Sequence, residues 1–472
     1  VETSEGLRFC LNPPHQHPDP VLVGDRPWEK LGICSYNTVM KEGDRGFRLW
    51  YGAMLETGLP QEGAIRLGYA ESEDGLHWTK PTLGLISYEG SKENNLVAPL
   101  QERQSMQGAT IYRDDRAPEK ERYKLWSKFQ PTDKQIEAGV LPGLWALRSP
   151  DGLHWEECED QPNPKDQLCD TQNMLFWDDR IEEYVGYTRV RETQRLEEAA
   201  VAEGKGKYRS IGRIASPDFR TWSKTQIVLE ADAKDLNIPV PYQRDDPRPN
   251  IDYYTSCAMK YVDAEDVYVM MPSAFYHWGE EDYPATMDVQ LLTSRDGIQW
   301  ERKGERKPFL RLGFDGGAEA GMIFANPWLI PMGNELWLYY VGTSYTHGSK
   351  GGERERNGLF LSTMRRDGFI SLDAEHGGGA FSTPILDFSG DHLEVNFDGS
   401  AGGWLKVEIQ DANGKPLPGY ALSDADGLRG NAIQKTVTWQ GRSEVGGLAG
   451  HTVRLRFVMR DAKLYAFQFQ GP

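Results

Sequence analysis

The feature that most constrains this chain is a short motif, Ser-x-Asp-Gly-x-x-Trp, that returns at a nearly constant interval. It reads "SEDGLHW" at Ser72, "SPDGLHW" at Ser149, "SPDFRTW" at Ser216 and "SRDGIQW" at Ser294, with a fainter "MRRDGFISL" at Met364. The Asp residues of the copies stand at positions 74, 151, 218, 296 and 367, so the steps are 77, 67, 78 and 71 residues. A repeat of this length indicates one supersecondary unit copied five times, each needing its neighbours to bury its faces.

A second repeat runs in phase with the first. Before each turn lies an aromatic-rich run, such as "FRLWYGAM" from Phe47 or "LWLYYVGT" from Leu336, and before each run lies another strand-like segment. Short aromatic and β-branched runs without a helical period are typical of buried strands, and the polar connections between them of hairpin turns. We expect the Asp and Ser of each turn to bind their own hairpin backbone, and the Trp to pack between neighbouring units.

One unit is thus a four-stranded antiparallel meander of about 70 residues. Five such sheets bury both faces when they stack radially, which predicts an all-β fold, a five-bladed β-propeller followed by a C-terminal β-sandwich domain. After "DGFISLDAEHGGGAF" no further unit fits, and alternating segments such as "LKVEI" and "VRLRFVM" are typical of sandwich strands. We expect residues 1–30 to wrap around the propeller, residues 31–378 to form it and residues 379–472 to form the sandwich.

Composition excludes some partners. The formal net charge of −18 argues against a nucleic-acid backbone or an anionic membrane surface as partner. No apolar run approaches the roughly 20 residues that a membrane span needs, so we expect no membrane insertion. Because the chain starts at Val1 without Met, we expect that a leader or tag was removed and that the protein is secreted or periplasmic in a bacterium. The five cysteines show no zinc spacing; Cys10 with Cys34 and Cys158 with Cys169 are alternative bridges to unpaired thiols.

Three acidic residues stand where innermost strands begin, and function on a propeller lies at the funnel mouth that these strands line. Asp170 precedes the strand "NMLFW", Asp252 opens "IDYYTSCAM", and Glu319 precedes "GMIF". Carboxylates held together at the axis shift one another's pKa, and glycoside hydrolysis needs such an acid–base pair. The alternative is that these carboxylates line the funnel and are satisfied by backbone amides. The Asp residues of the repeated turns are poor candidates because their role is structural.

Other polar side chains at the same rim are candidates for substrate binding. Those at the starts of innermost strands are Asn37, Gln107, Gln172 and Tyr254, and those at the ends of second strands are Arg189, His277 and His347. Arg189 can hold a substrate carboxylate or hydroxyls, or keep a catalytic Asp ionised. Two His residues without a third ligand are weak evidence for a metal, so we predict neither a catalytic metal nor a cofactor, with a structural calcium ion left open.

These hairpins, the trailing sandwich and the funnel acids resemble the five-bladed β-propeller glycoside hydrolases of families 32, 43, 62, 68, 117 and 130. The resemblance covers roughly residues 30 to 472, and the layout is most similar to family 32. It implies one acid as base or nucleophile, one as pKa modulator or transition-state stabiliser and a Glu as general acid. Blade order assigns these roles to Asp170, Asp252 and Glu319, with permutation of the roles left open. The chain departs from the families in blade one, where "SYNTV" has Asn37 and no acid, so it resembles a divergent branch.

The resemblance implies a glycoside hydrolase that removes a terminal sugar, furanosides included, from a polysaccharide or oligosaccharide. A non-catalytic glycan-binding propeller is the second interpretation and gains from the missing acid of blade one. A glycoside phosphorylase is the third. It requires a basic cluster for phosphate, for which Arg189, Arg191 and Arg244 are the candidates.

Overall fold

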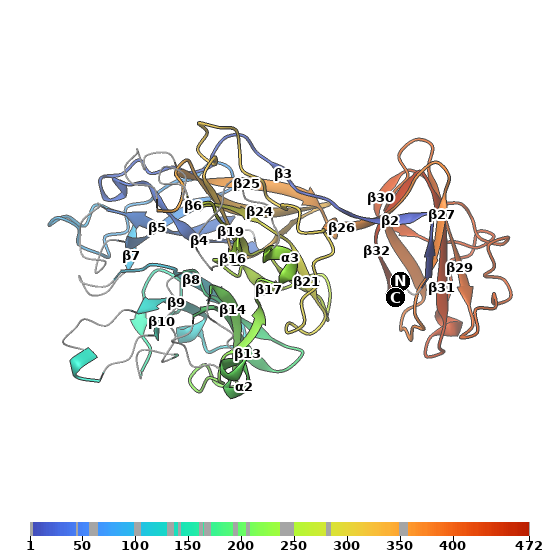
Figure 1. Cartoon of the computed structure of the whole chain (residues 1–472), viewed down its shortest axis with the longest axis horizontal. Helices are drawn as coiled ribbons and strands as arrows, with labels where there is room; N and C mark the ends of the chain where they lie inside the picture. Colours follow the sequence, from blue (N-terminus) through green and yellow to red (C-terminus); the bar gives the residue numbers. More distant parts are fainter. Residues whose placement is uncertain are drawn as a thin grey trace.

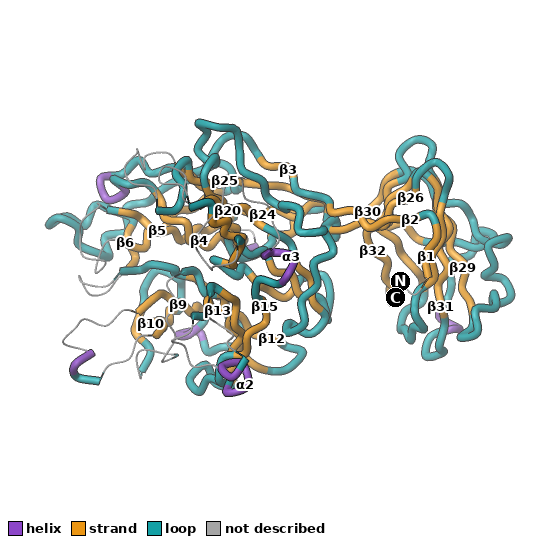
Figure 2. Tube along the Cα trace, in the orientation of Figure 1, coloured by secondary structure: helices purple, strands orange, loops and turns teal. Residues whose placement is uncertain are grey.

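A computed structural model gives the structure of the chain. It describes residues 3–43, 46–55, 65–98, 105–129, 136–139, 143–159, 164, 171–191, 197–203, 208–236, 250–279, 285–348 and 357–471. Two β-rich bodies are joined by a narrow waist (Figure 1). Strands dominate both, and helices such as α2 (Glu198–Ala202) and α3 (Ala233–Leu236) are short (Figure 2). The all-β fold predicted from the sequence, a five-bladed propeller followed by a sandwich, is confirmed.

The first three blades are antiparallel meanders whose strands follow chain order from the axis outward. Blade one contains β4 (Ile33–Lys41), β5 (Phe47–Met54), β6 (Ile65–Ser72) and β7 (Leu96–Ala98). Blade two contains β8 (Thr110–Arg113), β9 (Tyr123–Phe129), β10 (Gly143–Ser149) and β11 (Glu156–Glu157), with the 3-10 turn η3 (Glu119–Glu121) between its first strands. Blade three contains β12 (Met174–Asp178), β13 (Glu183–Val190), β14 (Ser210–Ser216) and β15 (Gln226–Leu229).

In blade four each long strand is interrupted. Its inner strand is β16 (Ile251–Tyr253) with β17 (Ala258–Lys260), its second β18 (Tyr268–Met270) with β19 (Ser273–His277), and its third β20 (Ala285–Val289) with β21 (Leu292–Ser294). On one side of the breaks, β19 pairs with both β16 and β20. On the other side, β18 pairs with both β17 and β21. Pro272 stands at the break in the second strand, where its missing N–H removes a ladder hydrogen bond.

Blade five takes its outermost strand from the other end of the chain. It consists of β22 (Met322–Ala325), β23 (Ile330–Met332), β24 (Glu335–Thr343), β25 (Asn357–Arg365) and β3 (His15–Gln16). The segment after the fifth turn, which the repeat pattern assigned to this blade, is instead β26 (Ile370–Ala374) of the sandwich. The fifth copy of the motif lacks the Trp that anchors an outer strand to its neighbour, and the chain leaves the propeller there.

The sandwich has two sheets, and the N-terminal residues supply a strand to each. One contains β1 (Thr3–Glu5), β27 (Gly379–Ser382), β31 (Arg454–Arg460) and β29 (Trp404–Gln410). The other contains β2 (Leu7–Leu11), β26, β32 (Ala462–Gln470), β28 (His392–Asp398) and β30 (Asn431–Thr436). The short 3-10 turn η4 (Gly446–Leu448) lies in the same domain, and η1 (Pro27–Glu29) precedes blade one. Residues 3–11 were expected to wrap the propeller; instead β1 pairs with β27 and β2 pairs with β26, so each adds an edge strand to one sheet of the sandwich.

The repeated turns hold their own hairpins as predicted. In the second copy, Ser149 Oγ accepts the Gly152 N–H at 2.9 Å, and Asp151 Oδ1 accepts the N–H groups of Leu153 and His154 at 2.8 and 2.9 Å. The same bonds recur in the copies at Ser72 and Ser294. The Trp residues pack between blades, for example Trp222 against Trp126 with ring centroids 4.8 Å apart.

Three of the turns also latch onto the blade before them. A side chain in the second strand of one blade donates to the turn glycine carbonyl of the next. The pairs are Trp50 to Gly152 at 2.7 Å, Tyr187 to Gly297 at 2.6 Å and Tyr339 to Gly75 at 2.8 Å. The last pair joins blade five to blade one, so the same contact that links consecutive blades also closes the ring.

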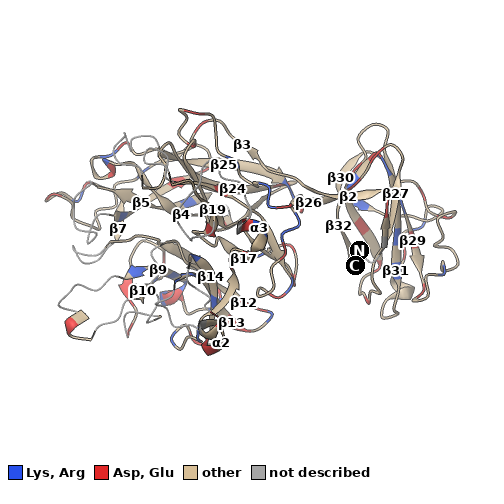
Figure 3. Ribbon diagram, viewed as in Figure 1, with Lys and Arg blue, Asp and Glu red and all other residues tan. Residues whose placement is uncertain are grey.

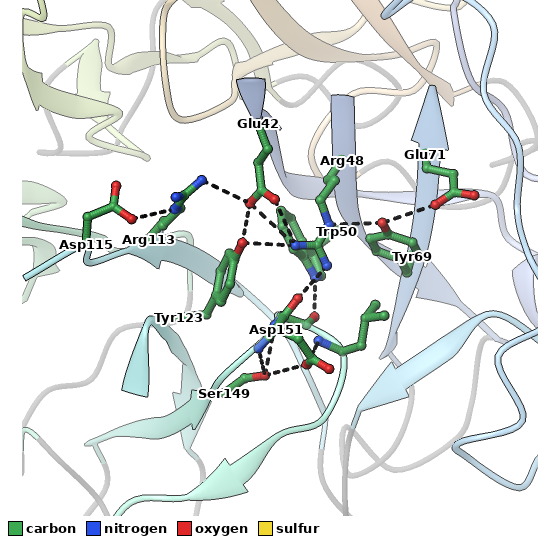
Figure 4. Close-up of polar contacts among 12 residues, drawn as sticks. Glu42, Arg48, Trp50, Tyr69, Glu71, Arg113, Asp115, Tyr123, Ser149 and Asp151 are labelled. Carbon is green, nitrogen blue, oxygen red and sulfur yellow. Dashed lines mark hydrogen bonds and ion pairs between the residues drawn. The ribbon is translucent and has the colours of Figure 1, made fainter. Parts of the chain in front are cut away.

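A buried acid–tyrosine contact repeats beside the latch. At the junction of blades one and two, the Tyr123 hydroxyl donates to Glu42, and Arg48 donates to the Tyr123 oxygen at 3.0 Å and to the Asp151 carbonyl at 2.6 Å (Figure 4). Corresponding hydroxyl–carboxylate bonds, each 2.6 Å long, join the next two pairs of blades. These are Tyr184 to Asp114 and Tyr268 to Asp178. These three carboxylates are therefore structural, since the hydroxyl donors satisfy them where they are buried.

The cysteines test one of the predicted bridges. Cys10, Cys34 and Cys257 are free thiols, so the alternative bridge between Cys10 and Cys34 is wrong. Cys169 lies outside the described residues, and its pairing with Cys158 stays a prediction.

Basic and acidic residues are interspersed on both domains (Figure 3). Over the described part of the chain, no helix is long and apolar enough to cross a membrane.

Candidate functional site

Five of the side chains predicted from the sequence come together at one end of the propeller. Asp252 lies in β16 and Tyr254 follows that strand. Arg189 is the last residue but one of the second strand β13, and His277 is the last residue of the second strand β19. His347 follows β24, the second strand of blade five. In a meander the second strand ends where the inner strand begins, so three blades deliver these groups to the same rim.

Asp252 is the carboxylate of this cluster. It is 2% exposed, and its Oδ2 lies 3.1 Å from Arg209 Nη1 and 3.2 Å from His277 Nε2. A carboxylate buried to this degree requires such partners, because an unpaired buried charge is expensive. Asp252 is thus held between a permanent cation and an imidazole.

Arginines gather on the same side of the site. The Arg189 guanidinium carbon lies 4.8 Å from the centre of the Tyr254 ring, and that of Arg209 lies 5.2 Å from the same ring and 4.4 Å from the Phe275 ring. Burial lowers the pKa of Arg189, and the neighbouring cations Arg191 and Arg209 lower it further. The pKa of Arg191 is lowered in the same way, by burial and by Arg209.

Neutral polar groups complete the cluster. The Tyr254 hydroxyl lies 3.3 Å from His347 Nε2. Burial lowers the pKa of His347 to about 4, with repulsion from Arg209 and Arg189 contributing, so this imidazole is neutral at physiological pH. Burial, followed by the proximity of Tyr254, raises the pKa of Tyr36 well above its usual value, so its hydroxyl keeps its proton.

An apolar cluster from blades one, four and five packs against these polar groups. Its members are Cys34, Tyr36, Phe275, Ala285, Met287, Met322 and Phe324, with Tyr254 against it. Tyr254 meets the Phe324 ring edge-on, with centroids 6.1 Å apart, and stacks on Phe275 at 5.7 Å. The site therefore combines an aromatic wall with a concentration of cations, which excludes water from one side of any bound group.

Glu319 has hydrogen-bond partners of its own. It precedes β22 and is half-buried, and its Oε2 accepts the Tyr340 hydroxyl at 2.7 Å. Gln16 of β3 donates to the Tyr340 oxygen at 3.2 Å. Burial raises the pKa of Glu319, with opposing hydrogen bonds from Tyr340 and Gln16. As far as the described residues show, Glu319 and Asp252 share no bonding partner.

Of the remaining predicted residues, three bond to neighbouring backbone or side-chain groups and one lies outside the described part of the chain. Asn37 and Gln172 are buried and bonded to backbone: Asn37 Oδ1 accepts the Gly52 N–H at 3.1 Å, and Gln172 Nε2 donates to the Asn37 carbonyl at 3.0 Å. The Gln107 carbonyl accepts the Lys128 N–H at 2.9 Å. Asp170 lies outside the described residues, so its catalytic role stays a prediction.

Sequence reasoning missed two groups. Arg209 precedes β14, directly across the β13–β14 hairpin from Val190 and its neighbours, and the register Val190 to Ser210 is the signal that would have found it. Asp288 lies in β20, and burial raises its pKa to about 7; its carboxylate accepts the Tyr276 hydroxyl at 3.2 Å. An acid inside the apolar run "ATMDVQLL" was the available signal. Over the described residues, no group of three or more His, Cys, Asp or Glu is placed to hold a metal ion.

Comparisons with known proteins concern the fold alone. No family model matches the chain, and no curated protein matches it. Among solved structures it is similar to an N-acetylgalactosamine deacetylase from F. plautii in complex with blood group B trisaccharide, with a TM-score of 0.47, 15% identity and coverage of 77% of this chain and 97% of that chain. It is also similar to an endo-arabinase from Bacteroides thetaiotaomicron, with a TM-score of 0.43, 12% identity and coverage of 72% and 96%.

A third similar structure belongs to the GH130 family of mannoside phosphorylases, which contains glycoside hydrolases that target β-1,2 mannosidic linkages in Candida mannan. Its TM-score is 0.44 at 12% identity, over 75% of this chain and 94% of that chain. These likenesses agree with the predicted resemblance to propeller glycoside hydrolases as far as the fold is concerned. At such identities and TM-scores they carry no argument about chemistry, which has to come from this chain's own residues.

Proposed function

We propose that the protein is a glycan-active enzyme, a glycoside hydrolase that removes a terminal sugar at the mouth of the propeller funnel. The observation that supports this most is the Asp252 carboxylate, 2% exposed and in contact with Arg209 and His277 at the start of an innermost strand. An aromatic wall and several hydrogen-bonding groups surround it, which suits a sugar with an apolar face and many hydroxyls.

The proposed chemistry needs one group that gives a proton and one that takes it. Glu319 gives its proton to the glycosidic oxygen as the bond to the anomeric carbon breaks, a role that its raised pKa suits. Asp252 takes a proton from the attacking water or, in a retaining reaction, attacks the anomeric carbon itself. Asp170 is the third acid of the proposal, with the role of base or pKa modulator.

A glycoside phosphorylase is the second candidate, and the concentration of Arg189, Arg191 and Arg209 favours it. In that reaction a phosphate oxygen replaces water as the attacking group, and arginines provide the forked donors that phosphate prefers. Arg244, named as a phosphate candidate from the sequence, lies outside the described residues.

The test is a screen of aryl furanosides and pyranosides and of natural oligosaccharides, each with and without inorganic phosphate. We expect release of one sugar without phosphate, and at least a hundred-fold loss of kcat in Asp252→Asn and Glu319→Gln, on the order expected for loss of an acid or base. Asp315→Asn is the matched control, since Asp315 is an exposed acid in the same loop as Glu319. Release that requires phosphate would change the reaction to phosphorolysis. Glycan binding without any turnover would contradict the proposed enzymatic activity and favour a non-catalytic glycan-binding propeller.

A further inference from the structure

The sandwich sheet that contains β29 and β31 has an outer face on which cations gather. In β31 every second side chain, from Leu455 to Met459, is buried in the domain core. Because side chains alternate across a strand, Arg456 and Arg460 lie on the outer face of the sheet. Figure 1 shows β29 and β31 on the side of the sandwich that is turned away from the propeller.

The neighbouring strand adds an aromatic ring and a third cation to this face. In the register of β29 and β31, Trp404 stands opposite Arg460, and Lys406 stands opposite Val458. Side chains in such pairs start about 5 Å apart, so the indole lies beside the row of cations. These four residues and Arg456 are all partly exposed, and together we call them the basic face.

The other end of the same sheet face is covered by the chain that follows β29. Glu408, which also points outward from β29, is 3% exposed and accepts the Leu422 N–H at 2.9 Å. Arg454, on the outer face of β31, donates to the Ala412 carbonyl at 3.1 Å. The covering segment therefore shields the acid of this face and leaves the basic face open.

The cations of the basic face have neutral partners. Arg460 Nη2 lies 2.6 Å from His376 Nε2, and Lys406 donates to the Leu422 carbonyl at 3.3 Å. Over the part of the chain that the structure describes, no hydrogen bond or ion pair involves the Arg456 side chain, and no ion pair joins Lys406 or Arg460 to a carboxylate. These positive charges are therefore available to an anion from outside the molecule.

Acidic residues at the border of the basic face are bonded to other groups. Asp461 Oδ2 lies 3.0 Å from His376 Nδ1, and Asp426 accepts the Thr438 hydroxyl at 2.7 Å. Glu5 stands in the outermost strand β1, opposite Ala380 of β27. The carboxylates thus lie around the basic face rather than among its cations.

The net charge of the sandwich also differs from that of the whole chain. Residues 379–472 contain nine Lys or Arg and ten Asp or Glu, a formal charge of −1, against −18 for the chain. Charges on the propeller are screened beyond about 8 Å at physiological ionic strength, so the local cations determine the potential at the basic face. A polyanion that the propeller would repel is therefore accepted there.

We propose that the basic face binds an anionic polysaccharide, through its carboxylate or sulfate groups and with one sugar ring stacked on Trp404. The proposal goes beyond the proposed function, because this face belongs to the other domain and takes no part in chemistry at the funnel. From Arg456 to Arg460 the row of cations spans about 13 Å, which suits charges repeated along a chain. The indole favours a glycan over an acidic protein segment, since it offers an apolar surface to a sugar ring.

The experiment is calorimetric titration of the full chain at pH 7 and low ionic strength with two matched pairs of ligands. One pair is polygalacturonate and its fully methyl-esterified form, and the other is dextran sulfate and dextran. We expect one anionic member to bind at least ten-fold more tightly than its neutral match, and to weaken as salt is added. The pair that shows this preference identifies carboxylate or sulfate. Poly-glutamate, which has charges but no sugar ring, should bind more weakly than that anionic glycan.

Variants locate the binding on the basic face. Arg456→Gln should weaken it roughly three-fold, as for one exposed ion pair, and Trp404→Ala roughly ten-fold through loss of stacking. Lys435→Gln is the control, because it removes one charge from an exposed position in β30 of the other sheet and should change nothing. Thermal melting shows whether each variant is folded.

Several outcomes would overturn the proposal. Equal binding of charged and neutral glycans, or no binding of either, would reject it. Equal losses in Lys435→Gln and Arg456→Gln would mean diffuse attraction, and poly-glutamate binding that Trp404→Ala leaves intact would favour an acidic protein partner.

The outcome is separable from that of the proposed function. Binding lost in Asp252→Asn but kept in Arg456→Gln would place the polysaccharide in the funnel and reject the basic face. Binding that persists in Asp252→Asn and is weakened in Arg456→Gln, with no turnover of any glycoside by the unaltered protein, would keep the basic face and reject the enzyme.

Discussion

At the scale of single residues, His347 links the candidate site to pH. Its pKa in the folded protein is about 4, against 6.5 for the unperturbed group, because of burial and the nearby Arg209 and Arg189. The unfolded chain therefore binds a proton that the folded chain refuses, and stability is lost as pH falls from about 6.5 to about 4. Asp252 opposes this shift and His277 adds to it.

We expect His347→Asn to flatten this dependence. The free energy of unfolding of the unaltered protein, measured with urea at about pH 7 and about pH 4.5, should fall more steeply than that of the variant. The difference should be about 1 kcal/mol after allowing for solvent around the partly exposed ring. Parallel pH dependence in the two proteins would contradict the assignment of the shift to His347.

Asp288 contributes a pH dependence of stability that is opposite in sign to that of His347. Burial raises its pKa to about 7, so the folded chain keeps a proton that the unfolded chain releases near 3.8. Stability is therefore lost as pH rises between these values. Asp288→Asn keeps an oxygen to accept the Tyr276 hydroxyl, and we expect it to stabilise the protein at pH 8 by about 2 kcal/mol relative to pH 5. Melting temperatures at the two pH values test this, and equal shifts would contradict it.

Residues of the candidate site were predictable from the sequence where they stand at the end of a strand that the repeat pattern locates. Asp252, Arg189 and His277 were identified because each stands at the end of a recognisable apolar strand, and the meander brings such ends together. Arg209 was not, because "YRSIG" has no aromatic run that announces the third strand. The hydrogen bond from Tyr340 to Glu319 was not predicted, because the position of a residue at the end of a strand does not specify the partner of its side chain.

At the scale of elements, the repeated turn is a contact between blades as well as a hairpin. Gly297 has φ +71°, and a Cβ there would lie 2.7 Å from the Tyr187 hydroxyl oxygen that bonds to its carbonyl. We expect Gly297→Ala to destabilise the propeller by about 2 to 3 kcal/mol through strain and loss of the latch.

Gly316 is the matched control for this prediction. It has φ +76°, but no heavy atom lies within 4 Å of the place that a Cβ would take, so Gly316→Ala carries the backbone strain alone. Its cost should be about 1 kcal/mol. Denaturant titration of both variants tests the difference, and equal destabilisation would show that the latch adds nothing to the conformational strain.

The motif that revealed the blades also explains where the sequence-based prediction was wrong among the elements. Four copies contain the Trp that packs against the preceding blade, and each is followed by a strand or bridge of the same blade. The fifth copy has Phe369 and no Trp, and its chain continues into β26 of the sandwich. The absent Trp was a signal for departure, but the outer place in blade five is taken by His15 and Gln16, which no local pattern indicated.

At the scale of the whole molecule, one arginine connects the propeller to the sandwich. Arg365, the last residue of β25, donates to Asn396 Oδ1 at 2.6 Å and to the Ala432 carbonyl at 2.6 Å. It also donates to Asn431 Oδ1 at 2.5 Å. Several charge-assisted bonds from one fork favour a fixed arrangement of the two domains.

We expect Arg365→Ala to loosen this connection. Calorimetry should show the single unfolding transition broadening or splitting in two, with a loss of about 2 to 4 kcal/mol. Arg8→Ala is the control, because Arg8 forms an exposed pair with Glu375 at 3.3 Å within the sandwich and should change little. An unchanged calorimetric profile in Arg365→Ala would mean that the strands at the waist suffice to couple the domains.

The strands β1, β2 and β3 cannot pair until late in synthesis. They are translated first, yet their partners lie in the sandwich and in blade five, and Asn12 donates to Ser371, 359 residues further along the chain. At ribosomal rates the interval before those partners emerge is of the order of a minute. During that time the leading residues have unpaired backbone. A ribosome that stops before β25 is made therefore releases a chain in which neither domain is complete, and the leading strands stay unpaired until blade five and the sandwich have been made.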